Sequence, residues 1–170
     1  METTNYFNDV EFNGKLFSLA HLNASFIEFY GEHIEKTLKI KVLYTNHCFT
    51  ERQDRTKTDS ERIFSIERYE LSKLLPGIIA GMNNKATKVL QTTAKRNFAY
   101  SVKTTLNEKA YNIFFEIKKS TAKDNDCDLV IYIESAYVFD EERKLEHSGR
   151  IRFLILCQKI YKGEKIHCRK

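Results

Sequence analysis

Apolar and polar residues alternate through most of the second half of the chain. From Asn97 onward, an apolar side chain stands at nearly every second position, as in strands with one buried face. Four such strands are expected, with apolar positions within Phe98–Val102, Tyr111–Ile117, Leu129–Ile133 and Ile151–Cys157. Polar turns separate them, so the pattern predicts an antiparallel meander whose last two strands form a hairpin.

The first half has shorter and more varied patterns. Asn13-Gly14 is a strong hairpin signal, so Val10–Phe12 is expected to pair with Leu16–Leu19. The spacing of apolar residues in His21–Tyr30 predicts a short helix. Leu38–Tyr44 alternates cleanly and predicts a strand.

A polar segment and a helical region follow that strand. Thr50–Arg62 has no aliphatic or aromatic side chain and is expected to be an exposed loop. Apolar residues then recur at helical spacing, and Pro76 divides them into one helix before it and a second running toward Thr92. The predicted fold class is therefore α+β, with helices in the first half packed on a curved antiparallel sheet of about four to six strands.

The composition fits a single folded domain. The chain has 170 residues, and 42% of them are hydrophobic, which suffices for a packed core. The expected parts are a hairpin and helix in 1–37, a strand, loop and helices in 38–96, and the meander in 97–170. No apolar run can span a bilayer, and Met1–Asp9 lacks the features of a secretory signal. We expect a cytoplasmic protein with no membrane partner.

The cysteines are expected to be free thiols. None of the four forms a C-x-x-C pair, and no secretory signal places the chain in an oxidising compartment. His47-Cys48 and His167-Cys168 raise the alternative of a zinc site. Adjacent residues on a strand point to opposite faces, however, so this spacing disfavours zinc. We expect no metal and no cofactor.

The net charge of +5 is unevenly distributed. Residues 85–123 contain 9 basic and 2 acidic residues, and residues 149–170 contain 7 and 1. Between them, residues 124–148 contain 8 acidic and 2 basic residues. The two basic segments could form one face that binds a phosphate backbone, or they could simply be solvated cations on the sheet.

Polar residues at strand ends are the strongest sign of chemistry. No P-loop, dinucleotide-binding, zincin or hydrolase motif occurs, which argues against those enzyme classes. Metal-independent cleavage of RNA needs an acid, a base and a cation for the phosphorane. The candidate catalytic residues for that chemistry are His47, Thr50, Tyr137 and Arg152. The candidate substrate-binding residues are Arg52, Arg62, Arg68, Ser135 and Arg150.

Four of these candidates have an assigned role. His47 titrates near neutrality and can act as base or acid, and Tyr137 can transfer a proton if a nearby Arg lowers its pKa. Arg150 or Arg152 can bind a phosphate bidentately. In the expected hairpin of the last two strands, Tyr137 would lie opposite these two arginines. Each of these residues is also an ordinary surface or packing residue in many proteins.

The order of these features resembles the barnase–RelE-like superfamily of small metal-independent ribonucleases, which includes phage and plasmid toxins. The resemblance rests on His47–Thr50, on Arg68–Pro76, and on Ser135–Tyr137 followed by Arg150–Phe153. It implies RNA cleavage that leaves a cyclic phosphate, and a cognate antitoxin or immunity protein as partner. The chain differs from the small toxins in its greater length and its extra amino-terminal hairpin.

Two other classes of function stay open. Interleaved aromatic and basic residues in the expected meander suit a domain that binds single-stranded RNA without cleaving it. The aromatic residues in question are Phe98, Tyr100, Tyr111, Phe114 and Phe115, and alternating aromatics in strands usually form a core. An accessory or immunity-type protein that uses a sheet edge is the third possibility.

Overall fold

The structure is a computed structural model of the whole chain. It describes residues 6–93, 97–103, 108–123, 126–139 and 144–170.

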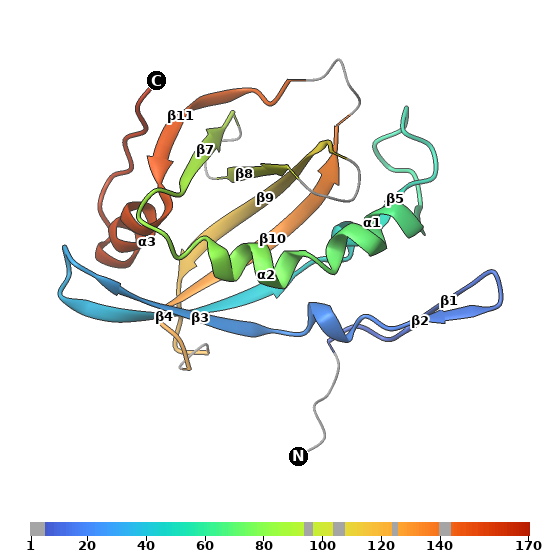
Figure 1. Cartoon of the computed structure of the whole chain (residues 1–170), viewed down its shortest axis with the longest axis horizontal. Coiled ribbons are helices and arrows are strands. Elements are labelled where there is room, and N and C mark those ends of the chain that lie inside the picture. Colours follow the sequence, from blue (N-terminus) through green and yellow to red (C-terminus); the bar gives the residue numbers. More distant parts are fainter. Residues whose placement is uncertain (1–5, 94–96, 104–107, 124–125, 140–143) are drawn as a thin grey trace.

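One curled seven-stranded sheet organises the molecule (Figure 1). Its order is β11-β7-β8-β9-β10-β4-β3, and every neighbouring pair is antiparallel except β10 with β4, which is parallel. The strands are β3 (Ser25–Gly31), β4 (Lys36–Tyr44), β7 (Lys88–Thr92), β8 (Phe98–Lys103), β9 (Ala110–Lys119), β10 (Leu129–Val138) and β11 (His147–Arg152). The parallel pair joins the first half of the chain to the second.

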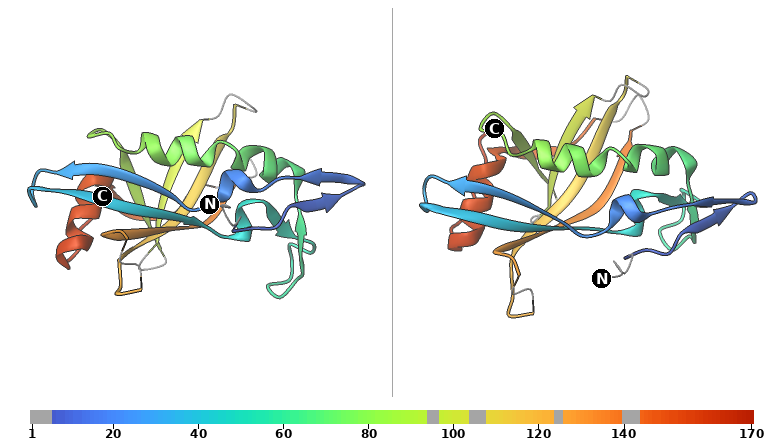
Figure 2. Two further views of the ribbon diagram at one scale, coloured as in Figure 1. Left: turned by 90° about the horizontal axis from the view of Figure 1, so that it is seen from below. Right: turned by 60° about the horizontal axis from the view of Figure 1, so that its bottom comes forward.

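Two small antiparallel ribbons lie outside this sheet. The first pairs β1 (Val10–Phe12) with β2 (Lys15–Phe17) and projects as an arm at the end opposite α3 (Figure 2). Asn13 and Gly14 both have positive φ at its turn, which confirms the predicted hairpin. The second ribbon pairs β5 (Thr50–Arg52) with β6 (Arg62–Phe64).

Short helices fill the remaining connections. The α-helices are α1 (Ile66–Ser72), α2 (Leu75–Gly81) and α3 (Phe153–Lys162), and the 3-10 turns are η1 (Ala20–Leu22) and η2 (Asn46–Cys48). Ser65 caps α1 by accepting from the Arg68 amide, and Pro76 lies in the first turn of α2. None of the described helices is long and apolar enough to cross a membrane.

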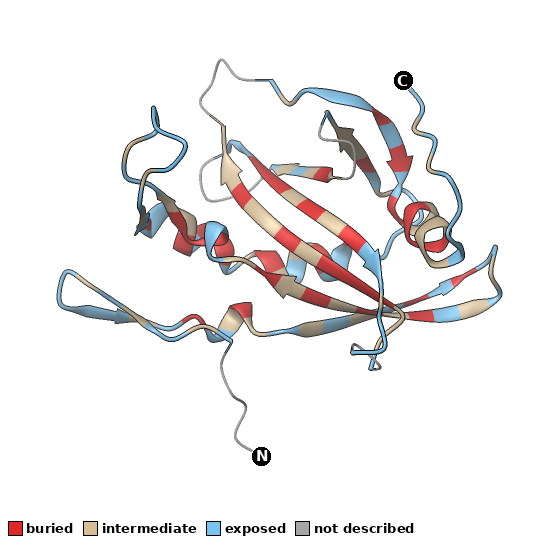
Figure 3. Cartoon of the chain, turned by 180° about the vertical axis from the view of Figure 1, so that it is seen from behind, coloured by how far each residue is buried: buried red, intermediate tan, exposed pale blue. Residues whose placement is uncertain are grey.

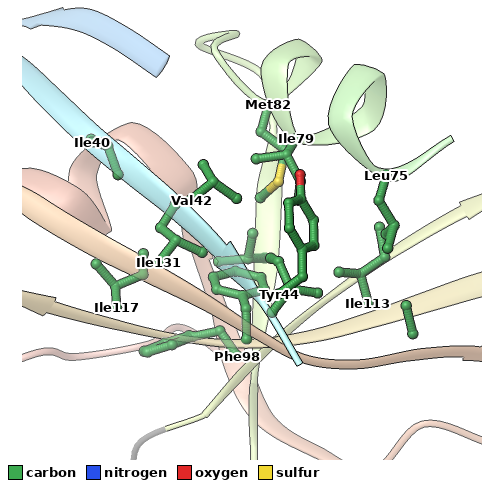
Figure 4. Close-up of a cluster of buried hydrophobic side chains, with 14 of the residues drawn as sticks. Ile40, Val42, Tyr44, Leu75, Ile79, Met82, Phe98, Ile113, Ile117 and Ile131 are labelled. Carbon is green, nitrogen blue, oxygen red and sulfur yellow. The ribbon is translucent and has the colours of Figure 1, made fainter. Parts of the chain in front are cut away.

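The core lies where the curled sheet meets α2. Ile79 of α2 and Met82, which directly follows this helix, face Val42 and Tyr44 of β4, and all four are buried (Figure 4). Buried and more exposed residues alternate along the long strands of the sheet (Figure 3). This alternation is what a sheet with one buried face requires.

The predicted fold class is wrong. Strands make up 43% of the described residues and helices 20%, and the sheet is mixed instead of antiparallel. The expected helix at His21–Tyr30 is largely strand β3, because backbone pairing with β4 buries Phe29 and leaves Phe26 and Tyr30 exposed. Helices therefore do not form the first half of a two-layer fold.

The second half also departs from the predicted meander. Strands β8, β9 and β10 are antiparallel neighbours, as expected. The segment from Phe153 onward is helix α3, because Phe153, Leu156 and Cys157 are buried on one helical face. The expected second helix ends at Gly81, and part of it is strand β7. Strand β11 pairs with β7, so the expected hairpin with β10 is wrong.

Candidate functional site

A cleft of about 610 Å³ lies between α1, the β5–β6 ribbon and the end of β10. Its wall contains the His47 imidazole, five cationic side chains and two carboxylates. The cationic residues are Arg52, Arg55, Arg62, Arg68 and Lys109, and the acidic residues are Glu51 and Glu67. Cations outnumber carboxylates, so the cleft favours an anionic ligand.

His47 is positioned by a turn that is fastened to β10. Thr45 caps the turn η2, and its hydroxyl accepts a hydrogen bond from the His47 amide at 3.2 Å. The same hydroxyl donates to the Glu134 carbonyl at 2.7 Å, and the Thr45 amide donates to the Ile133 carbonyl at 3.1 Å. Thr45 therefore joins the His47 turn directly to the strand that carries Tyr137.

A β-bulge turns Ser135 and Tyr137 toward the cleft. The pairing of β10 with β9 shifts register between Ile133 and Ser135. Ile133 and Ala136 both remain buried on either side of the shift. The alternation therefore changes phase at the bulge, and Ser135 and Tyr137 leave the core and line the cleft.

Two arginines hold the opposite wall. Arg62 donates from Nε to the Thr50 hydroxyl at 2.8 Å and from Nη2 to the Thr50 carbonyl at 2.6 Å. Arg68 donates from Nη1 to the Thr50 carbonyl at 2.9 Å and to the His47 carbonyl at 3.2 Å. Its guanidinium lies 4.7 Å from the centre of the Tyr137 ring. Because these contacts fix both groups, the wall is preorganised for an anion.

The electrostatics of the cleft favour a neutral imidazole. Burial lowers the pKa of His47 below its usual value, and the charges of Arg62, Arg68 and Arg52 lower that pKa further. Burial also lowers the pKa of Arg62 and Arg68, whose guanidinium groups remain protonated at any physiological pH. At neutral pH the cleft therefore combines a proton acceptor with fixed positive charge.

An aromatic cluster borders the cleft on the side of β10. Tyr137 stacks on Phe114 with ring centres 5.5 Å apart and an interplanar angle of 26°. The ring centre of Phe139 lies 5.4 Å from that of Tyr137. A second cavity of about 550 Å³ shares Tyr137 and Phe139 with the first. Aromatic faces beside a cationic cleft suit a ligand that carries both flat rings and negative charge.

The model of one protein family matches residues 9–161, which is nearly the whole chain. The chain belongs to the YjaZ family. The comparison with curated proteins gives no significant match, and neither does the comparison with solved structures. The family match does not bear on the resemblance to barnase–RelE-like ribonucleases, which stays a prediction.

The cleft of this YjaZ-family chain brings together six of the nine predicted site residues: His47, Arg52, Arg62, Arg68, Ser135 and Tyr137. Thr50 lies behind the wall, where it is buried and accepts hydrogen bonds from Arg62 and Arg68. Arg150 and Arg152 lie on β11, at the opposite edge of the sheet from β3 and outside the cleft lining. Within the cleft, the guanidinium groups held beside His47 are instead those of Arg62 and Arg68.

Sequence reasoning did not identify several residues of the cleft. Glu51 and Arg55 form an ion pair of 3.1 Å within the polar segment that was expected to be a loop. Glu67 and Lys109 also line the cleft. The run of charges from Glu51 to Arg62 was the available signal, because charges packed so densely beside a strand end can surround a ligand.

The described lining of the cleft contains no cysteine. Cys48 lies behind His47 in the core, and burial raises the pKa of its thiol to about 12. It is therefore protonated and unreactive at neutral pH. Within the described ranges, no cluster of three or more His, Cys, Asp or Glu side chains could hold a metal ion.

Proposed function

We propose that this cleft binds the phosphodiester backbone of single-stranded RNA and cleaves it without a metal ion. The observation that carries the proposal is the His47 imidazole in the cleft lining beside three arginines, with a pKa lowered by desolvation and by their charges. A neutral imidazole accepts a proton, and guanidinium groups pair with phosphate oxygens. A cytoplasmic location, where free cysteines stay reduced, belongs to the same proposal.

The proposed reaction assigns one role to each group. His47 takes the proton of the ribose 2′-hydroxyl, whose oxygen attacks the neighbouring phosphorus atom. The bond from phosphorus to the 5′-oxygen breaks, and that oxygen receives a proton from Tyr137 or from water. The products are a 2′,3′-cyclic phosphate and a 5′-hydroxyl. Arg62 and Arg68 stabilise the phosphorane, because contacts to Thr50 and His47 leave N–H donors on both guanidinium groups.

The test is incubation of the full chain with a labelled oligouridine in EDTA. Wild type is expected to produce fragments with cyclic phosphate ends, and His47→Gln is expected to lose this activity. His33→Gln is the matched control, because His33 is exposed and lies outside the cleft lining. Cleavage by His47→Gln at the wild-type rate would refute the role of His47.

The pH dependence of cleavage gives a second test. A base works only when it is deprotonated, so the rate should rise with pH through the pKa of His47. Burial and the neighbouring arginines lower that pKa, so the midpoint should lie below about 6.5, the usual histidine value. A rate that falls with pH over this range would contradict the assignment of His47 as base.

Binding without cleavage is the second candidate function. The stack of Tyr137 on Phe114 favours it, because bases can stack on aromatic rings without any proton transfer. In that case RNA would be retained in a salt-sensitive way and recovered intact. An antitoxin or immunity protein as partner stays a prediction from the resemblance.

A further inference from the structure

Four exposed cations line one face at the β11 edge of the sheet. They are Lys88 of β7, Arg150 and Arg152 of β11, and Arg169 of the carboxyl-terminal segment, and together they are termed the basic ladder. β7, β11 and the carboxyl-terminal segment lie side by side, away from the β5–β6 ribbon (Figure 1). The basic ladder is therefore separate from the cleft.

The register of the strands places these four side chains on the same face. Arg152 is opposite Lys88 in the antiparallel pair of β11 and β7. On the other side of β11, Arg150 is opposite Arg169, and the two residues exchange backbone hydrogen bonds of 2.7 and 3.0 Å. Ile151, between the two arginines of β11, is buried. Alternation along the strand therefore points the ladder away from the core.

Gly149 allows the carboxyl-terminal segment to join the ladder. A Cβ atom at this position would lie 2.8 Å from the Arg169 carbonyl oxygen and 2.9 Å from the Cys168 Cβ. Such distances are too short for any other residue without movement of the backbone. The place of Arg169 in the basic ladder thus depends on the absence of a side chain at Gly149.

The positive charges of the basic ladder are not neutralised by acidic side chains of the described residues. Like charges directly opposite each other on paired strands repel and destabilise a sheet. None of the four cations forms an ion pair with a described residue. Arg150 and Arg152 are about 6.7 Å apart along the strand, because two residues of a strand span about that length. A linear polymer of negative charge complements this regular row.

We propose that the basic ladder is a second binding surface for the phosphates of single-stranded nucleic acid. That the polymer is RNA rests on the proposed function of the cleft, whereas the charge complementarity does not. A membrane surface fits less well, because anchoring to lipid requires apolar side chains beside the cations. The large exposed apolar side chains of the described chain are Tyr6, Leu16, Phe26, Tyr30, Ile63 and Ile66, and none lies on β7, β11 or the carboxyl-terminal segment.

The test measures how binding depends on salt. Affinity for a fluorescent oligouridine of 20 nucleotides is measured by anisotropy in EDTA over a range of salt concentrations. Each phosphate contact to a single strand contributes about 0.7 to the slope of log K against log salt. Arg150→Gln with Arg152→Gln should therefore weaken binding and reduce the slope by about 1.4. Circular dichroism checks that each variant is folded.

The control removes the same charge elsewhere. Lys15→Gln with Lys123→Gln changes two exposed cations outside the ladder and should leave the slope nearly unchanged. Equal slopes for the ladder variant and this control would overturn the proposal. Binding of wild type to vesicles of anionic lipid, lost in the ladder variant while RNA binding is kept, would overturn it in favour of a membrane.

The two proposals can fail separately. All RNA binding is measured with His47→Gln as the starting protein, so cleavage does not consume the RNA probe. If wild type fails to cleave while the ladder variant loses binding, only the cleavage proposal fails. If wild type cleaves while the ladder variant binds normally, only the ladder proposal fails.

Discussion

Replacing Arg68 with methionine tests the construction of the cleft most directly. Methionine keeps much of the aliphatic stem of Arg68 but removes its charge and its N–H donors. The substitution breaks the bonds to the His47 and Thr50 carbonyls and the contact with the Tyr137 ring. We expect a less stable protein and a changed titration of His47.

The expected loss of stability follows from these contacts. The Thr50 carbonyl keeps its bond from Arg62, so losing the second bond costs about 1 kcal/mol. The bond to the His47 carbonyl, at 3.2 Å, contributes about 1 kcal/mol. The contact with the Tyr137 ring adds about 0.5 kcal/mol, because Arg68 is partly exposed. The sum, about 2.5 kcal/mol, corresponds to a decrease in Tm of roughly 5–10 °C for a chain of this size.

Urea unfolding followed by far-UV circular dichroism measures this change, since the chain has no tryptophan for fluorescence. Arg55→Met is the matched control. Arg55 is exposed and pairs with Glu51 within one chain segment, so its loss should cost less than about 0.5 kcal/mol. NMR titration should show a higher pKa for His47 in Arg68→Met, because Arg68 lowers that pKa. Equal stability of the two variants would refute the role of Arg68 as the organiser of the wall.

Three further substitutions probe other parts of the structure. Thr45→Val removes the bonds to the His47 amide and the Glu134 carbonyl and should cost about 1–2 kcal/mol in urea unfolding, with loss of RNA binding in the cleft. Tyr111→Phe should stabilise the protein by about 1 kcal/mol, because its buried hydroxyl has no hydrogen-bond partner among the described residues; a loss of stability would reveal a partner. Gly149→Ala should detach the carboxyl-terminal segment, seen as faster hydrogen exchange at the Arg169 amide, and unchanged exchange would contradict the close approach.

Local sequence signals predicted the elements whose contacts are also local. The Asn13-Gly14 hairpin is confirmed because its turn alone determines the pairing of β1 with β2. The strands β8, β9 and β10 are confirmed as antiparallel neighbours, because short connections and strict alternation favour that arrangement. These predictions needed no knowledge of the rest of the chain.

Elements that depend on distant partners could not be predicted in the same way. His21–Tyr30 has helical spacing, but β4 offers a complete row of backbone partners, and the strand forms instead. The apolar run from Phe153 fits either a strand or a helix, since five consecutive apolar residues show no period. Pairing of β11 with β7 likewise depends on long-range contacts that the local sequence does not show. This pairing separates Arg150 from the cleft.

Local structure brings some residues of the cleft together, and pairing of distant strands adds Tyr137. The sequence could therefore predict only part of the cleft. His47, Arg62 and Arg68 lie within 22 residues of one another, so a turn, a ribbon and a capped helix suffice to gather them. Tyr137 reaches them only because β10 pairs in parallel with β4 and carries a bulge after Ile133. The bulge also offers the two carbonyls that Thr45 binds, so the same irregularity aims Tyr137 and anchors His47. In the proposed reaction, the positions of the base His47 and the acid Tyr137 thus both depend on one feature of β10 that alternation in the sequence does not indicate.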